Sequence, residues 1–277
     1  MKKATVTGGE GFVGRNLVRK LQSMNVETQI IEKNSIRGKN WQQKVLKNLE
    51  EFEPNCVFHI GANSDTLTAD VQSTMELNFE ATLIVAEWCK YQSIPLIYAS
   101  SAAIYGSEGH IPENLYAWTK YAGEKVVSLC GGVGLRYFNV YGPGENHKGR
   151  MASVFLQAML DSSEDGPFKL FPGSPKRDFV YIEDVVEANI LAYETFNTSS
   201  GKIYEVGTAE PRTFEEGMKI LGIPFEYLDD DFLPIGYQKY TSANEDRFLP
   251  GWKPKYNLEK GLKKYQDYFF NNLERSI

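Results

Sequence analysis

The sequence predicts an α/β fold, a doubly wound parallel sheet of the Rossmann type with a smaller domain toward the C-terminus. Three observations predict this fold. A short apolar strand at residues 3–7 ends in a glycine-rich turn, apolar residues then recur at helical spacing, and further apolar strands alternate with helices. The chain has 277 residues, of which 42% are hydrophobic, so it is long enough to bury a large core.

The first element is the segment KATVTGGEGFVGRNLVRKLQ, which reads as strand, turn and amphipathic helix. Gly8 permits a tight turn, Gly11 lets the backbone approach a pyrophosphate, and Gly14 lets the helix pack closely on the strand. The N-terminus of the helix offers unpaired N–H groups and the positive end of the helix dipole. We therefore predict a dinucleotide site at this turn that also includes Phe12 and Val13.

The second strand, in VETQIIEKN, ends at Glu32, which lies 18 residues after Gly14. An acidic residue at this distance can bond a ribose hydroxyl, and its charge repels a 2′-phosphate, which favours NAD. Lys33, Arg37 and Lys39 follow at once and could instead accept a 2′-phosphate. The cofactor is therefore predicted to be tightly bound NAD or NADP, and the sequence leaves the choice between them open.

The next elements continue the alternation of strand and helix. The segment NCVFHIGAN, residues 55–63, is a buried strand, a long helix spans about 70–91, and IPLIYASS is another buried strand that ends at Ser100 and Ser101. Ligands of such a sheet lie at the carboxyl ends of its strands. The cofactor contacts expected from these segments are Gly61, Ala62, Asn63 and Asn78.

The segment ENLYAWTKYAGEKVV has the pattern of a helix, on which Tyr116 and Lys120 are four residues apart. Side chains at this spacing are neighbours on one side of a helix. Such a pair is common by chance. Its place after a dinucleotide-binding turn and a strand that ends in serines indicates a catalytic pair.

Five segments together carry a family resemblance: TGGEGFVG, SSAAIYG, YAWTK, LRYFNVYGPG and RDFVYIEDV. They resemble the extended short-chain dehydrogenases/reductases of the nucleotide-sugar epimerase type, from the first strand to about residue 208. The resemblance implies an NAD(P)-dependent epimerase that acts on a nucleotide sugar, in carbohydrate metabolism that includes lipopolysaccharide synthesis. It also implies an active site of Ser101, Tyr116 and Lys120.

The chemistry explains these residue types. A tyrosine with a pKa near 10 is a poor base at neutral pH, but the Lys120 ammonium and an oxidised nicotinamide would both favour the phenolate of Tyr116. Tyr116 could then remove a proton from a sugar hydroxyl, while Ser101 bonds the reacting oxygen and Lys120 also holds the nicotinamide ribose. Nucleotide-sugar dehydratases carry an Asp-Glu pair where this chain has Ala102 and Ala103, which excludes that branch.

Residues 1–140 are predicted to form the dinucleotide-binding domain, with later segments around 178–208 returning to it, and residues 141–277 to form mainly a substrate-binding domain. Arg177 matches the family arginine that binds the substrate diphosphate, a task that suits a planar guanidinium. A surface ion pair with Asp178 is its alternative role. Val140 is expected at the cofactor. The remaining expected substrate contacts are Asn139, Arg150, Gln157, Phe171, Ser174 and Tyr237.

The segment YFNVYGPGENHKGRMASV is most similar to the ADP-glycero-manno-heptose 6-epimerase branch of the family. In that branch the lysine of the His-Lys-Gly loop is a second acid/base, which the match places at Lys148. Gln157 stands where the branch has a histidine, and Arg150 where it has a small serine, so the substrate can differ. The alternatives are a UDP-hexose 4-epimerase or related reductase and, in another class, a dinucleotide-binding protein without catalysis.

Composition excludes other classes of protein. The net charge of −6 argues against a nucleic-acid partner, and no apolar run approaches the roughly 20 residues that span a membrane. Three scattered cysteines and three scattered histidines predict neither disulfides nor a metal site. We expect a cytoplasmic protein and, from the resemblance, a homo-oligomer. The segment between Glu32 and Asn55 is too short and too helical for the third strand usual in the family.

Overall fold

The structure, a computed structural model, describes residues 1–36, 38–107, 109, 111–161, 166–229 and 237–273. Its centre is a sheet of six parallel strands in the order β2-β1-β3-β4-β5-β10. The strands are β1 (Lys3–Thr7), β2 (Glu27–Ile31), β3 (Cys56–His59), β4 (Leu96–Ser101), β5 (Val133–Tyr137) and β10 (Ile203–Val206). The predicted parallel α/β fold is confirmed.

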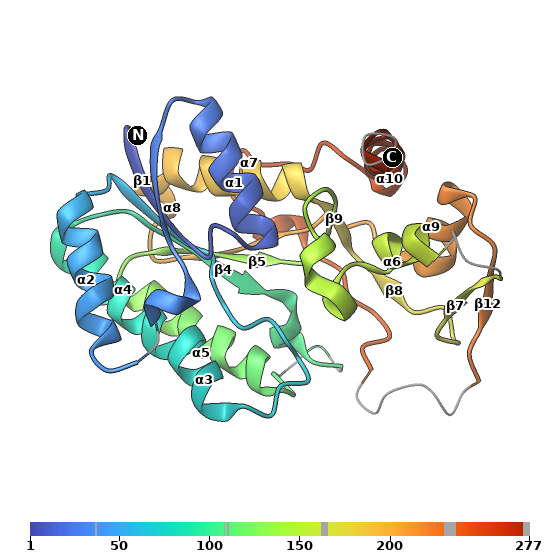
Figure 1. Ribbon diagram of the computed structural model, residues 1–277, viewed down its shortest axis with the longest axis horizontal. Helices are drawn as coiled ribbons and strands as arrows, with labels where there is room; N and C mark the ends of the chain where they lie inside the picture. The colour runs from blue at the N-terminus through green and yellow to red at the C-terminus, as the bar shows by residue number, and fades with distance from the viewer. Residues whose placement is uncertain (37, 108, 110, 162–165, 230–236, 274–277) are drawn as a thin grey trace.

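Helices cover both faces of this sheet (Figure 1). On one face α1 (Phe12–Ser23) packs against α7 (Ile182–Glu194), and on the other α4 (Ala81–Gln92) packs against α2 (Trp41–Phe52) and α5 (Leu115–Leu129). Two buried apolar clusters, one for each face, join the helices to the strands. Burial of an apolar side chain stabilises the fold by roughly 1.5–3 kcal/mol, so these faces fix the helices on the sheet.

The long helix expected over 70–91 is present but irregular. It consists of α3 (Val71–Met75), a π-helical turn at Glu76–Glu80 and α4. A π-helical turn changes the directions in which neighbouring side chains point, and such turns are frequent at functional sites. Here the turn carries Asn78, whose side chain is buried.

The third strand usual in the family is not found among the described residues between β2 and β3. The chain forms a 3-10 turn at Lys33–Ile36 and then α2. Trp41, Val45 and Leu49 recur at helical spacing and are buried, which explains why this segment is a helix.

The strand order places a crevice at the carboxyl edge of the sheet. The chain passes from β1 outward to β2 and then returns to β3 on the other side of β1. At such a reversal the loops after the two inner strands diverge, and ligands bind between them. Gly8 after β1 and Gly61 after β3 meet at this point, because a Cβ on Gly8 would lie 2.5 Å from the Cα of Gly61.

The C-terminal half adds a second cluster of elements with its own core, to the right in Figure 1. Tyr141, Phe155, Tyr181 and Tyr265 are fully buried within it. Its helices are the short η4 (Asn146–Met151), α6 (Val154–Asp161), α9 (Phe214–Leu221) and α10 (Leu258–Leu273). Two further short helices, α8 (Phe196–Ser199) and η6 (Glu245–Arg247), belong to the central-sheet side, where they contact α7 and β10. The small sheets pair β6 (Asn139–Tyr141) with β9 (Phe179–Tyr181), β7 (Phe168–Leu170) with β12 (Phe225–Tyr227), and β8 (Lys176–Arg177) with β11 (Arg212–Thr213).

Within the later half, α7 and β10 lie on the central sheet, since α7 packs against α1 and β10 pairs with β5. The domain boundary at residue 140 stays a prediction. Of the helices in the described residues, none combines the length and the apolar character needed to cross a bilayer.

Candidate active site

A cavity of about 1140 Å³ opens at the crevice between β1 and β3. The loops after β1, β3 and β4 form its floor, α5 contributes one wall, and the segment from Tyr137 to Val154 contributes the other. Sixteen residues predicted for the site from the sequence line this one cavity: Gly8, Gly11, Phe12, Val13, Gly14, Glu32, Lys33, Gly61, Ala62, Asn63, Ser101, Tyr116, Lys120, Asn139, Val140 and Lys148.

The glycine turn has the geometry that a diphosphate requires. Gly8 has φ +65°, which few other residues adopt without strain. A Cβ on Gly14 would lie 2.0 Å from the carbonyl oxygen of Gly8, so only glycine lets α1 start this close to the turn. Gly11 precedes the first turn of α1, and no side chain caps the N–H groups there. These free donors and the helix dipole suit an anionic group.

Glu32 lies at the end of β2, where a ribose hydroxyl is expected. Its Oε1 accepts a hydrogen bond from the backbone N–H of Glu10 at 2.7 Å, which fixes the carboxylate beside the glycine turn. Lys33 is exposed but lines the cavity. Lys39 is exposed and does not line it, and Arg37 lies outside the described residues. The residues present therefore fit a dinucleotide, with an acidic group where a ribose hydroxyl is expected.

Asn78 was predicted as a cofactor contact, but the structure places it behind the cavity wall. Its side chain accepts from the backbone N–H of Asn63 at 2.7 Å, and donates to the carbonyl oxygen of Asn63 at 3.0 Å and to Thr119 Oγ1 at 3.1 Å. The π-helical turn aims the amide at this loop, where all of these bonds form. Asn78 therefore shapes the cavity through Asn63, which itself lines it.

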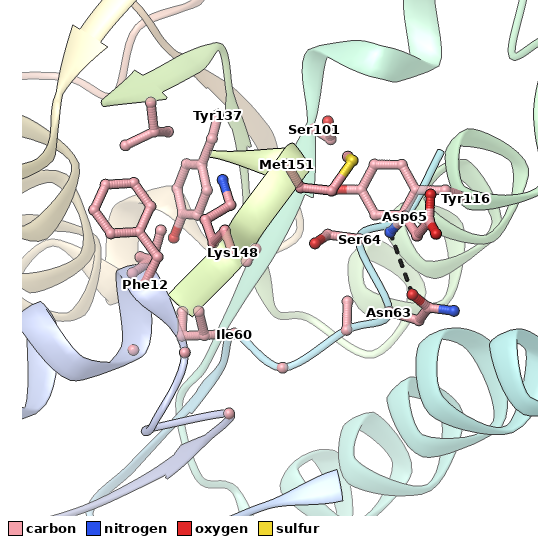
Figure 2. A pocket seen from close by; sticks show the side chains of 18 of the residues that line it. Phe12, Ile60, Asn63, Ser64, Asp65, Ser101, Tyr116, Tyr137, Lys148 and Met151 are labelled. Atoms are coloured by element: carbon pink, nitrogen blue, oxygen red, sulfur yellow. Dashed lines mark hydrogen bonds between the residues drawn. The ribbon is translucent and has the colours of Figure 1, made fainter. Parts of the chain in front are cut away.

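Ser101, Tyr116 and Lys120 line the cavity together at the carboxyl end of β4. Figure 2 shows Ser101 and Tyr116 at this end of the cavity. Asn114 caps α5 by accepting from the N–H of Ala117, so Tyr116 stands in the first turn of the helix. Lys120 is buried, donates to the carbonyl oxygen of Ala99 at 2.7 Å, and lies 6.0 Å from the centre of the Tyr116 ring. The spacing of four residues therefore brings the predicted pair together.

The pKa values of Tyr116 and Lys120 differ from the expectation that a charged Lys120 favours the phenolate of Tyr116. Burial raises the pKa of Tyr116, while its hydrogen bond with Ser101 acts in the opposite direction. Burial lowers the pKa of Lys120 to about 7, while the carboxylate of Glu124 acts to raise it. Burial thus favours the neutral form of both groups, and Tyr116 needs a further positive charge in the cavity to become a phenolate.

Lys148 stands in η4 and lines the same cavity. Its Nζ lies 5.3 Å from the centre of the Phe12 ring, and burial lowers the pKa of its ammonium while Glu145 acts to raise it. Figure 2 shows Lys148 beside Tyr137 and Phe12, away from Tyr116. The two candidate acid/base groups therefore reach the cavity from different sides.

Arg150 and Gln157 were predicted as substrate contacts, but neither lines the cavity. Arg150 forms an ion pair with Asp65 at 2.8 Å, and its side chain is 68% exposed. Gln157 donates to the carbonyl oxygen of Ala152 at 2.8 Å. Because Asp65 lines the cavity, the ion pair joins the loop after β3 to the loop that carries Lys148. Arg150 and Gln157 therefore fix the loop that carries Lys148 rather than line the cavity.

Arg177 forms a second group beside the cavity, together with Phe171, Tyr237 and Phe214. Its guanidinium lies 4.9 Å from the centre of the Tyr237 ring and 5.9 Å from that of Phe214, while the Phe171 and Tyr237 rings are 5.2 Å apart. Only 5% of Arg177 is exposed, and burial lowers the pKa of its guanidinium. Phe214 also lines the cavity, so it connects the two.

The alternative role for Arg177, an ion pair with Asp178, is not formed. Asp178 accepts from the backbone N–H groups of Thr208, Ala209 and Ala243. Within the described ranges, no carboxylate forms an ion pair with Arg177, which donates only to the carbonyl oxygen of Lys176. Ser174, in the turn before it, is exposed and lies outside the cavity lining. A buried cation without a carboxylate partner suits an anionic ligand.

Sequence reasoning missed several residues of the cavity. Ser64 and Asp65 follow the end of β3, so their place after a buried strand was an available signal. Met151 lies among Ser101, Ser64 and Tyr116 in Figure 2, and it directly follows the predicted loop residues. Phe214 had no local signal, because only the tertiary fold brings α9 to the cavity.

Comparison with known proteins agrees with this geometry. The model of the NAD dependent epimerase/dehydratase family matches residues 4–207. An ADP-L-glycero-D-manno-heptose-6-epimerase of Brachyspira hyodysenteriae is 34% identical over 95% of this chain and 96% of its own. The crystal structure of the Helicobacter pylori enzyme of that name has a TM-score of 0.83 at 29% identity, over 97% of this chain and 96% of its own. UDP-glucose 4-epimerase of Thermotoga maritima, solved with UDP-glucose, has a TM-score of 0.84 at 24% identity, over 98% and 99%.

Proposed function

We propose that this chain, which belongs to the NAD dependent epimerase/dehydratase family, inverts one carbon of a nucleotide-diphosphate sugar by transient oxidation and re-reduction. The observation that carries the proposal is the meeting of Ser101, Tyr116 and Lys120 in one cavity with a diphosphate-binding glycine turn. NAD, when bound, accepts a hydride from the sugar carbon and later returns it. The protein must hold the sugar and move the proton.

In the proposed reaction Tyr116 removes the proton of the sugar hydroxyl and later gives it back. Ser101 donates a hydrogen bond to the same oxygen, in line with its bond to Tyr116. Lys120 is fixed by the carbonyl oxygen of Ala99 and supplies positive charge beside the tyrosine when it is protonated. Inversion requires the keto sugar to present its other face, and Lys148 is the proton donor for that second pose.

The cofactor is proposed to be NAD rather than NADP, tightly held so that it is reused. The Glu32 carboxylate, fixed by the N–H of Glu10, would lie against a 2′-phosphate and repel it. Lys33 is exposed, so water screens its positive charge and it offsets little of the repulsion between Glu32 and a 2′-phosphate. The relative affinities of the purified protein for NAD and NADP test this preference.

The substrate diphosphate is proposed to bind at Arg177. The guanidinium is already dehydrated and stacked on Tyr237, so it is ready for a bidentate contact with phosphate oxygens. Phe171, Ser174 and Asn139 complete the nucleotide and sugar contacts predicted from the sequence.

The sugar is proposed to be ADP-glycero-manno-heptose or a close relative, with inversion at carbon 6. The proteins of Brachyspira and Helicobacter carry this name, and the loop that holds Lys148 has the predicted branch pattern. A UDP-hexose 4-epimerase is the second candidate, because Arg150 departs from the small serine of the 6-epimerase branch and pairs with Asp65 of the cavity lining. We also propose a homo-oligomer in the cytoplasm, where the free cysteines Cys56, Cys89 and Cys130 would stay reduced.

Two experiments test the proposal. The nucleotide released by denaturing the purified protein is identified, and NAD is expected. ADP-glycero-manno-heptose and UDP-galactose are then offered separately, and NMR follows the new epimer. Turnover of the UDP sugar alone would refute the 6-epimerase while keeping the mechanism, and absence of dinucleotide binding would refute both. Lys148→Ala is expected to retain the cofactor and lose epimerisation.

A further inference from the structure

Glu145 is a buried carboxylate to which the family resemblance assigned no role. It has no exposed surface, and within the described part of the chain it forms no ion pair. Taking a carboxylate out of water is costly unless hydrogen bonds replace the water. The buried Glu145 carboxylate therefore requires hydrogen-bond donors around it.

Four hydrogen bonds to Glu145 come from both sides of one loop and from a distant helix. Before the loop, the N–H of Gly142 donates at 3.2 Å. After the loop, Ser153 donates through its N–H and, at 2.7 Å, through its hydroxyl. The hydroxyl of Tyr265 in α10 donates at 3.1 Å. One carboxylate therefore closes residues 145–153 into a ring, here named the Lys148 loop.

The Lys148 loop presents its side chains to the cavity, where His147, Lys148 and Met151 form part of the lining. The loop also contacts α1, because Lys148 Nζ lies 5.3 Å from the centre of the Phe12 ring. Just before the loop, the side chain of Asn16 in α1 donates to the carbonyl oxygen of Pro143 at 2.9 Å. Glu145 thus lies where α1, the Lys148 loop and α10 converge.

The position of the carboxylate also affects charge in the loop. Ser153 caps α6 by accepting from the N–H of Leu156, so Glu145 lies at the positive end of that helix dipole. Its charge opposes the effect of burial on Lys148. The other titratable groups facing this part of the cavity are Tyr137 and His147.

We propose that Glu145 is a positioning residue that fixes the Lys148 loop for epimerisation and, through Tyr265, makes the order of that loop depend on α10. The inference rests on the function proposed above for Lys148. A merely structural carboxylate would stabilise the fold without affecting proton transfer, so the two roles can be separated.

The test compares Glu145→Gln with Tyr265→Phe in the full chain with its cofactor. Glu145→Gln keeps the shape but weakens charge-assisted bonds, so kcat for ADP-glycero-manno-heptose is expected to fall roughly 10- to 100-fold, with cofactor content unchanged. The alkaline limit of the kcat profile is expected to move to lower pH, because Lys148 loses the charge that raises its pKa. Tyr265→Phe keeps the charge, so it should lower kcat less and leave that limit in place.

Hydrogen exchange of residues 145–153 gives a readout that needs no substrate. Both variants are expected to exchange faster than the wild type in this segment. The control is Glu183→Gln, because Glu183 accepts from the hydroxyl of Tyr256 at 2.8 Å and forms an ion pair with Lys264 of α10, but is half-exposed and lies outside the cavity. It should change neither exchange in the loop nor kcat.

Unchanged exchange in both variants would overturn the proposal, as would faster exchange with a wild-type kcat and pH profile. If Glu145→Gln does not fold, Tyr265→Phe and Ser153→Ala decide the exchange result. Wild-type turnover by Lys148→Ala would instead refute the function proposed for that lysine, while the exchange of the loop would still decide the role of Glu145.

Discussion

Replacing Tyr116 with phenylalanine tests the centre of the proposed mechanism. The ring position depends on the Asn114 cap and on packing beside Lys120, which phenylalanine keeps, while the hydroxyl that moves the proton is lost. Loss of a positioned acid/base group lowers kcat by roughly 10²- to 10⁴-fold, or about 3–5 kcal/mol of barrier. The folded state loses only the bond to Ser101, so the free energy of unfolding should change by about 0.5–1.5 kcal/mol.

The assay follows epimer formation by NMR and measures the nucleotide released from the same protein sample. Cofactor content should match the wild type, because the glycine turn, Glu32 and Lys120 are unchanged. Tyr121→Phe is the matched control, since Tyr121 lies on the same helix, packs on Trp118 and does not line the cavity. A kcat for Tyr116→Phe within about twofold of this control would refute Tyr116 as the base.

Three further predictions concern the scaffold of the site. Gly14→Ala brings a Cβ to 2.0 Å from the Gly8 oxygen, so it should cost about 1–3 kcal/mol of stability, measured by urea unfolding, and abolish dinucleotide retention. Arg136→Met leaves the buried Glu124 without its partner at 2.6 Å and should cost about 3–5 kcal/mol in the same assay. Lys120 has a folded pKa of about 7 against 10.5 when unfolded, so the unfolded chain binds the extra proton and apoprotein stability should rise between these pH values. Lys120→Met should remove that rise, and an unchanged slope would contradict the assigned pKa.

The parts of the site that sequence alone could predict are those fixed by short-range geometry. The glycine turn follows from one strand and one helix start, and Tyr116 and Lys120 meet because four residues make about one helical turn. The end of a buried strand indicated Ser100 and Ser101, and the family resemblance at SSAAIYG selected Ser101. Each of these signals lies within a few residues of the side chain it places.

The parts that sequence could not predict depend on partners far along the chain. Arg150 was expected in the sugar pocket, but it pairs with Asp65, which is 85 residues away. Asn78 was expected at the cofactor, but a π-helical turn directs it to Asn63. Tertiary packing determines which partners these side chains bind, and no local sequence pattern predicts those partners.

The burial of Tyr116 and Lys120 would make proton transfer in the proposed mechanism depend on other charges in the cavity. In the folded protein burial favours the neutral form of both groups, so Tyr116 is not a base on its own. A positive charge nearby lowers the pKa of a phenol, and the nicotinamide is positive only when it is oxidised. In the proposed mechanism Tyr116 would therefore act as a base while the nicotinamide is oxidised, and as a neutral phenol able to return the proton once it is reduced. Greater exposure of the pair would weaken this coupling, because water would screen the charge.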